Sequence, residues 1–179
     1  MAKKSGFTLI EMVIVIVILA IVSAVAAPKF INLQRDARIA LIKDISAAMH
    51  ASSKLVQSKA HVNKIHDGEL TIGSNTVKIE GGYIAGHWND SWRYAIELSK
   101  EVGFTRKNSV CTTHEICGVG NQRRVPGLPI TTNQRGVVAI WLEDFSLSDG
   151  CYVYYYNPNT PNNSDDTVPP TIGTVTTGC

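Results

Sequence analysis

The chain has 179 residues, of which 44% are hydrophobic and 18% are charged. This composition excludes a wholly disordered chain and suits one globular domain with additional segments. The 17 basic and 15 acidic residues give a formal net charge of +2. Since no overall basic excess is available to neutralise phosphates, we expect no nucleic-acid partner.

The N-terminal segment is the most informative part of the chain. Lys3 and Lys4 precede an apolar run from residue 7 to residue 27, in which Glu11 is the only charged residue. As a helix, this run would be about 31 Å long, close to the thickness of the hydrocarbon core of a bilayer. The two lysines suit the cytoplasmic side of a membrane. The segment therefore predicts a transmembrane helix.

Three interpretations of this segment differ in what is removed from it. A secretory signal peptide would be cut after Ala26 and would release a soluble periplasmic binding domain. A plain anchor would stay whole. Neither explains Glu11, because a carboxylate in an apolar membrane helix costs about 2.5–3.5 kcal/mol. Cleavage after Gly6 would instead give Phe7 a free amino group, with which Glu11 of a neighbouring chain could pair.

The sequence GFTLIE at residues 6–11, followed by this apolar run, resembles the processing site of type IV prepilins and pseudopilins. The resemblance implies that a prepilin peptidase cuts after Gly6 and methylates the new N-terminal Phe7. Residues 1–6 would be the leader, and residues 7–28 the transmembrane and filament-core helix. It also implies residence in the bacterial inner membrane before assembly, contact with the pilus assembly machinery, and then an extracellular pilus of identical subunits in a helical filament.

Pro28 follows the apolar run and removes one backbone donor. Beyond it, residues 29 to 60 contain no glycine or proline, and apolar side chains recur every three or four positions. We therefore expect a kink or a loosened stretch at Pro28 and then an amphipathic helix of about eight turns. Residues 29–38 resemble the mannose-sensitive haemagglutinin pilin group in particular.

The chain changes character after this helix. Two β-prone runs, residues 69–72 and 76–79, flank a short Gly-Ser-Asn turn and predict a hairpin. A second helix is expected from Asp90, as its N-cap, to Glu101, with Gly103 closing it.

The C-terminal third is rich in strand signals. Residues 136–142 form a continuous apolar run typical of a central strand, and residues 151–156 predict a strand antiparallel to it. Residues 157–170 predict an exposed loop and residues 171–177 an edge strand. These elements predict an α+β fold, in which a long N-terminal helix packs on a small antiparallel sheet, as in pilins. Residues 29–179 would form the amphipathic helix and a disulfide-bonded globular head.

Four cysteines, Cys111, Cys117, Cys151 and Cys179, follow the membrane segment. An even number of cysteines beyond a translocated segment favours disulfides in an oxidising compartment. Three pairings are open, and the sequence does not choose between them. We favour Cys111–Cys117 with Cys151–Cys179, which would enclose the loop at residues 157–170. A C-terminal loop bounded by a disulfide is also implied by the pilin resemblance.

An alternative places Cys111, His114 and Cys117 in part of a zinc site. No fourth ligand is identifiable, so we predict no metal and no cofactor. The sequence shows no arrangement of nucleophile and base and no phosphate-binding loop, so we expect no enzyme. The three tryptophans suit either carbohydrate stacking or the core, and we expect the core.

We therefore expect a structural subunit of an extracellular type IV pilus-like filament that serves surface attachment, with host or surface carbohydrate as a candidate partner. Glu11 and Pro28 are the residues expected to serve assembly. The alternatives are a pseudopilin or minor pilin of a secretion or DNA-uptake machine, and the domain released after Ala26. The disulfide-bounded loop argues against a secretion pseudopilin, because many of these proteins lack it.

Overall fold

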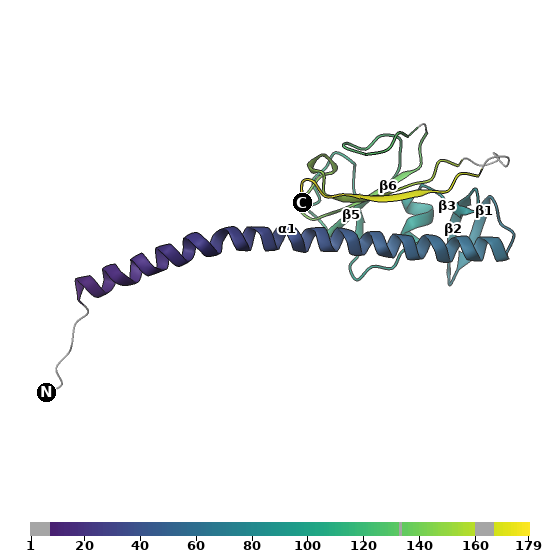
Figure 1. Ribbon diagram of the computed structural model, residues 1–179. Helices are drawn as coiled ribbons and strands as arrows, with labels where there is room; N and C mark the ends of the chain where they lie inside the picture. The colour runs from purple at the N-terminus through teal and green to yellow at the C-terminus, as the bar shows by residue number, and fades with distance from the viewer. Residues whose placement is uncertain (1–7, 133, 160–166) are drawn as a thin grey trace. The chain divides into compact units, whose positions relative to one another are not determined.

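The computed structural model describes residues 8–132, 134–159 and 167–179, and all of their side chains except that of Ile31. Figure 1 shows its main elements, which are one long helix, a three-stranded sheet and a five-stranded sheet. The chain divides into two compact units, Met1–Ala37 and Arg38–Cys179. The second unit holds both sheets. The predicted α+β fold, with a long N-terminal helix and a small antiparallel sheet, is confirmed.

Helix α1 (Leu9–Val62) contains Pro28 and continues past it. A proline inside a helix lacks the N–H that would bond to the carbonyl four residues earlier. The expectation that Pro28 does not end the helix is confirmed. The helix ends where Lys64 adopts a φ of 55° and the Ile65 N–H donates to the Ala60 carbonyl at 2.9 Å, which is a common way to satisfy the last carbonyls.

Within the second unit, one face of α1 packs on the sheets. Apolar side chains three or four residues apart lie on this face, as helical periodicity requires. They are Ile42, Ile45, Met49, Val56 and Ala60, and each is at most 4% exposed. These residues share one core with side chains from both sheets, so the predicted amphipathic helix is confirmed.

The three-stranded sheet has the antiparallel order β1 (Gly68–Ile72), β2 (Asn75–Glu80) and β3 (Tyr83–Ile84). The predicted hairpin is confirmed, with Leu70 opposite Val77. Strand β3 had no clear signal in the sequence, because it is only two residues long.

The predicted helix from Asp90 to Glu101 is wrong. The chain forms only a short π-helical turn, η1 (Trp88–Trp92), and one turn of α2 (Arg93–Ala95). Asp90 lies inside the turn and does not cap it. Ile96 is extended and buried, and Gly103 lies within strand β4. Pairing with a distant strand overrides the local helical pattern.

The five-stranded sheet has the order β4–β5–β6–β7–β8. The strands are β4 (Val102–Phe104), β5 (Ile116–Gln122), β6 (Val137–Leu142), β7 (Tyr152–Tyr156) and β8 (Thr171–Val175). The pairs from β5 to β8 are antiparallel, whereas β4 pairs with β5 in parallel. The central position of β6, its antiparallel pairing with β7 and the edge position of β8 confirm three predictions.

Strand β5 was missed because two glycines weaken its strand signal. Close packing explains both, since a Cβ placed on Gly120 would clash with the Trp88 backbone nitrogen. A Cβ placed on Gly118 would lie 3.0 Å from Val102 Cγ1 and 3.3 Å from the Trp88 ring. Glycine suits both positions because Trp88 lies against the strand, and only the tertiary structure brings the two together.

Both faces of the five-stranded sheet are covered. On β6, Val138, Ile140 and Leu142 belong to the core shared with α1, while alternate residues such as Trp141 belong to a second core on the other face. The tryptophans are at most 4% exposed, which confirms that they pack in the core.

Candidate functional site

Helix α1 begins with a capping box. The Glu11 carboxylate oxygen Oε2 accepts hydrogen bonds from the Thr8 N–H at 3.1 Å and from the Thr8 hydroxyl at 3.0 Å. In return, the Glu11 N–H donates to Thr8 Oγ1 at 3.3 Å. Two of the unpaired donors at the helix start are thereby satisfied. Sequence reasoning singled out Glu11 but missed Thr8, although the Thr-x-x-Glu spacing before an apolar run is the signal of such a box.

The carboxylate keeps one oxygen for a further partner. Among the described residues, Glu11 Oε1 has no hydrogen-bond partner, because both bonds from Thr8 go to Oε2. Hydrogen bonds from neutral donors orient a carboxylate without neutralising its charge. An external cation could therefore approach this helix end.

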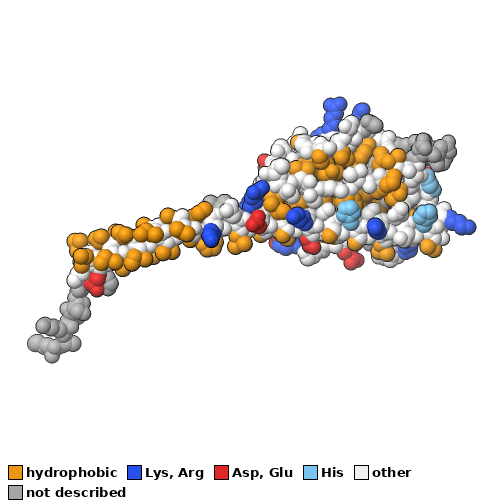
Figure 2. All heavy atoms as spheres, in the orientation of Figure 1, with side chains coloured by type: hydrophobic (Ala, Val, Ile, Leu, Met, Phe, Trp, Pro, Cys, Tyr) orange, Lys and Arg blue, Asp and Glu red, His pale blue; other side chains and the backbone are white. Residues whose placement is uncertain are grey.

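An uninterrupted apolar surface follows Glu11. From Leu9 to Val25, every large apolar side chain is exposed, by 44% to 82%. Figure 2 shows these side chains gathered along the N-terminal part of α1. This stretch is long and apolar enough to cross a membrane. A surface of this kind marks an interaction with a membrane or with other apolar chains.

The predicted processing residues Gly6 and Phe7 lie outside the described residues. Pro28 lies in α1 but not beside Glu11 in the chain, and nothing brings the two side chains together. Of the predicted processing and assembly residues, the structure therefore details the surroundings of Glu11.

The head carries two disulfides, Cys111–Cys117 and Cys151–Cys179, which is the pairing that we favoured. The second bond joins the chain end to the residue just before β7. The Cys179 carbonyl also accepts a hydrogen bond from Arg38 Nη1 at 3.2 Å, and the Arg38 guanidinium lies 5.2 Å from the centre of the Phe145 ring. The C-terminus is thus held to the second unit by a covalent bond and by a charged donor.

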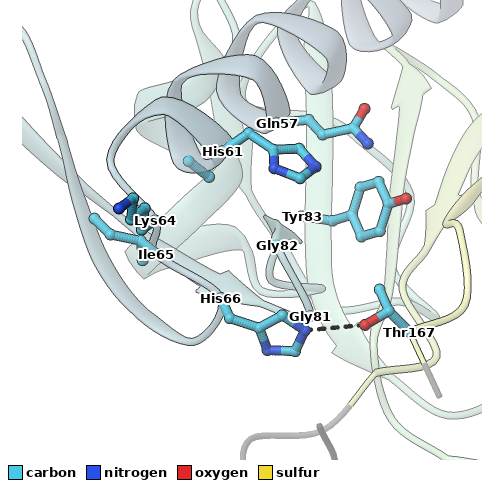
Figure 3. A pocket seen from close by; sticks show the side chains of 10 residues that line it. Gln57, His61, Lys64, Ile65, His66, Gly81, Gly82, Tyr83 and Thr167 are labelled. Atoms are coloured by element: carbon cyan, nitrogen blue, oxygen red, sulfur yellow. Dashed lines mark hydrogen bonds between the residues drawn. The ribbon is translucent and has the colours of Figure 1, made fainter. Parts of the chain in front are cut away.

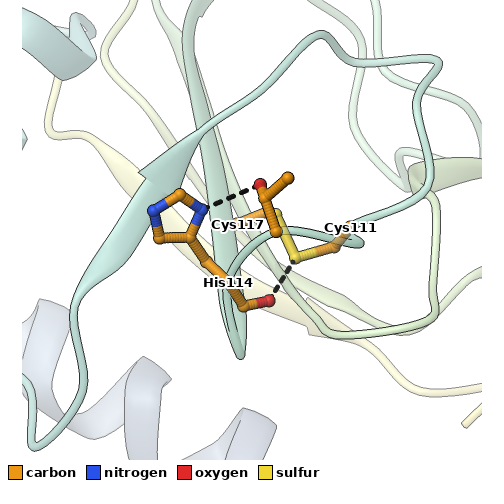
Figure 4. The surroundings of a disulfide bond; sticks show 4 residues. Cys111, His114 and Cys117 are labelled. Carbon is orange, nitrogen blue, oxygen red and sulfur yellow. Dashed lines mark hydrogen bonds between the residues drawn. A yellow bond between two sulfur atoms is a disulfide. The ribbon is translucent and has the colours of Figure 1, made fainter.

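The surroundings of the first disulfide decide between it and a zinc site (Figure 4). The His114 carbonyl oxygen lies 3.0 Å from Cys111 Sγ, and the His114 imidazole Nδ1 forms a hydrogen bond with Thr113 Oγ1 at 2.9 Å. A zinc site would need both sulfurs as thiolates, and here each is bonded to the other. Over the described residues, no group of three or more metal-binding side chains is found.

A buried polar network closes the base of the C-terminal loop. Asn157 is fully buried, and its Nδ2 donates to the carbonyls of Glu80 and Ile84, each at 3.0 Å. Its Oδ1 accepts from the Asn159 N–H and side-chain amide at 2.9 and 2.7 Å. Asn159 in turn forms two hydrogen bonds of 2.9 Å with the backbone of Val168. This network joins the end of β7 to the three-stranded sheet, and the sequence held no signal for it.

A cavity of about 480 Å³ lies at the C-terminal end of α1 (Figure 3). His61 and Lys64 line it from the helix end, Tyr83 from β3 and Thr167 from the C-terminal loop. His66 also lines it and forms hydrogen bonds with Thr167 Oγ1 at 2.9 Å and with Asp67 Oδ2 at 2.8 Å. An aromatic ring beside several donors suits a hydroxylated or acidic small ligand.

Residues 1–27 match the prokaryotic N-terminal methylation motif. A curated relative, prepilin peptidase-dependent protein A of Clostridium perfringens, is 31% identical over 80 residues, which are 44% of this chain and 57% of the relative. The chain thus spans little more than half of that relative. No solved structure matches the chain significantly.

The motif and the relative support a protein of the type IV pilin or pseudopilin type that carries a prepilin-like methylation motif. An apolar helix next to this motif is consistent with anchoring in a membrane before assembly. Neither comparison separates the mannose-sensitive haemagglutinin group from other prepilin-like groups.

Proposed function

We propose that this chain is a structural, non-enzymatic subunit of an extracellular type IV pilus-like filament that serves surface attachment. The observation that carries the proposal is the exposed apolar surface from Leu9 to Val25, which contains the Glu11 carboxylate near its start and overlaps the methylation motif at residues 1–27. Such a helix suits first a membrane and then a bundle of identical helices.

Processing comes first in this proposal. The prepilin peptidase cuts after Gly6, releases the leader at residues 1–6 and methylates Phe7. Residues 7–28 then serve as the transmembrane and filament-core helix, and residues 29–179 as the amphipathic helix and head. The dependence of the Clostridium perfringens relative on a prepilin peptidase, stated in its name, supports this step.

Assembly then exchanges lipid for protein around the apolar helix. The pilus assembly machinery extracts the helix from the inner membrane and adds it to the filament. The free oxygen of the Glu11 carboxylate pairs with the amino group of Phe7 in a neighbouring subunit. An uncompensated charge in an apolar interior costs several kcal/mol. Pairing of the carboxylate with the amino group removes this cost, and therefore stabilises each added subunit. At Pro28, one backbone hydrogen bond of the helix is missing, so the helix can bend there when the subunit enters the filament.

The head suits a location outside the cytoplasm. Two disulfides, Cys111–Cys117 and Cys151–Cys179, are typical of proteins that fold in an oxidising compartment. The cavity lined by His61, His66 and Tyr83 offers donors and a ring face to a carbohydrate, which supports the attachment role. The similarity of residues 29–38 to the mannose-sensitive haemagglutinin group is part of the same proposal.

Amino-terminal sequencing of the mature chain, together with electron microscopy of sheared surface material, tests the proposal. We expect the mature chain to begin at Phe7 and to be the abundant component of filaments. A mature chain that begins at Ala27 or Pro28 would contradict it and would support a released periplasmic domain. Correct processing without abundant filaments would favour a pseudopilin or a minor pilin.

A further inference from the structure

A second cavity, of about 200 Å³, lies in the head between α1 and the start of β5. Its floor is apolar, because Ile45, Ile116 and Leu142 line it and are at most 8% exposed. Leu41 stands at its rim and is 53% exposed. A cavity of about 150 Å³ with an aliphatic lining binds benzene, so this one can hold a phenyl ring.

The rim of this cavity is acidic. Four charged side chains line it, and two of them, Lys100 and Glu115, form an ion pair with each other. Asp44 and Glu97 have no ion-pair partner within the part of the chain that the structure describes. The rim therefore carries two uncompensated negative charges above an apolar floor, which suits an aromatic side chain with a cation beside it.

The chain itself contains a segment with that chemistry. Phe30 is 66% exposed and Leu33 is 64% exposed. Leu33 lies three residues after Phe30 and four after Lys29, so its side chain neighbours both of theirs on the surface of α1. Lys29 and Arg35 are the charged residues on either side of Phe30, and the nearest acid is Asp36. Arg35, five residues after Phe30, lies about 140° away around the helix, so Lys29 is the cation on the side of the ring. The segment therefore presents a phenyl ring with one cation next to it.

We propose that the cavity at Leu41–Asp44 is an interface between copies of this chain, which takes Phe30 of a second copy, with Lys29 of that copy beside Asp44. Two stretches of one α-helix cannot pack on each other, so the ring comes from another molecule. The inference rests on the proposed filament and identifies a contact between neighbouring subunits within it.

The interface has a consequence for assembly. Its two halves, the Phe30 segment and the cavity, are different surfaces of the same chain, so each molecule that fills a neighbour's cavity still offers its own. A heterologous contact of this kind propagates into an open helical filament unless its rotation happens to close a ring. Charge complementarity between rim and segment fixes which face of the helix is used.

Filament yield of the full chain tests the contact. Phe30→Ala should lower the yield of sheared filaments at least about fivefold, as expected when an aromatic anchor is removed from an interface pocket. Leu55→Ala is the matched control, because Leu55 is also an apolar residue on α1 and is also 66% exposed. It should leave the yield unchanged. Equal yields from the two variants would overturn the inference.

Charge reversal tests whether Lys29 of one copy lies beside Asp44 of the next. Asp44→Lys and Lys29→Glu should each lower the yield, and the double variant should restore it. The control pair, Lys29→Glu with Glu69→Lys, changes an exposed acid on β1 and should not restore it. Lack of rescue by the first pair, or equal rescue by both, would overturn the proposed contact.

Cross-linking places the two surfaces directly. The structure has no free cysteine over the described residues, and all four cysteines of the chain are in disulfides. Filaments of a Leu33→Cys, Leu41→Cys chain, treated with a short thiol cross-linker, should give a ladder of multimers. The Leu33→Cys, Leu55→Cys control should not. Intact filaments without the ladder would overturn the inference and leave the proposed function standing, whereas a wild-type chain that makes no filaments would overturn both.

Discussion

Replacement of Asn157 by leucine, which has a similar size, should destabilise the head by about 3 kcal/mol. The side chain is fully buried and takes part in four hydrogen bonds, two as donor and two as acceptor. The Ile84 carbonyl keeps a second donor, because the Tyr155 hydroxyl donates to it at 2.5 Å. The Glu80 carbonyl and the two Asn159 donors lose a buried partner, at about 1–3 kcal/mol for each group left unsatisfied. The three groups sum to about 3–9 kcal/mol. Rearrangement of Asn159 toward water reduces the loss, so we expect the lower end of this range, about 3 kcal/mol.

Chemical unfolding of the mature protein in detergent, followed by tryptophan fluorescence, measures this loss. The matched control is Asn108→Leu, since Asn108 is exposed and a surface change of this kind stays within about 0.5 kcal/mol. Asn157→Asp keeps the acceptor oxygen but replaces the donor NH2 group with a second acceptor oxygen. This oxygen cannot donate to the Glu80 and Ile84 carbonyls, so this variant should also destabilise the head. A free energy of unfolding for Asn157→Leu within 0.5 kcal/mol of the control would refute the view that this network joins the two sheets.

Four further predictions concern processing, assembly and the stability of the head. Gly6→Val should block cleavage, because a branched side chain replaces bare backbone, and mass spectrometry should find the precursor, six residues longer. Glu11→Gln keeps an acceptor for the capping box but removes the charge, so the protein should be processed yet form no filaments alone; normal filament yield would contradict the pairing. Cys179→Ser should lower the free energy of unfolding by about 2–4 kcal/mol, with faster protease cleavage inside the C-terminal loop as the readout. Hydrogen bonds from the Ser146 N–H and hydroxyl lower the pKa of Asp149. The stability that this carboxylate adds is therefore present above the ordinary aspartate pKa of about 3.9 and is lost as the pH falls below it. Asp149→Asn should therefore reduce the loss of stability that is measured as the pH is lowered through this range.

Local patterns in the sequence determined several parts of this protein. The apolar run from Leu9 to Val25 predicts a membrane-length helix because length and hydropathy alone decide whether a helix can span a bilayer. The hairpin of β1 and β2 follows from two short β-prone runs on either side of a tight turn. Strands β6 and β7 follow from short continuous apolar runs rich in β-branched and aromatic residues, which are typical of strands buried on both faces.

The tertiary structure alone decided the rest. The stretch from Trp88 to Glu101 has helical spacing, yet Ile96 is extended in the core and the chain runs on into β4, which pairs with β5. Strand β5 contains glycines that weaken its local signal and that Trp88 covers in the folded chain. The carbonyls to which the Asn157 side chain donates lie more than seventy residues away, at Glu80 and Ile84. Contacts between such distant segments leave no periodic trace in either one, because each depends on what the other presents once the chain has folded.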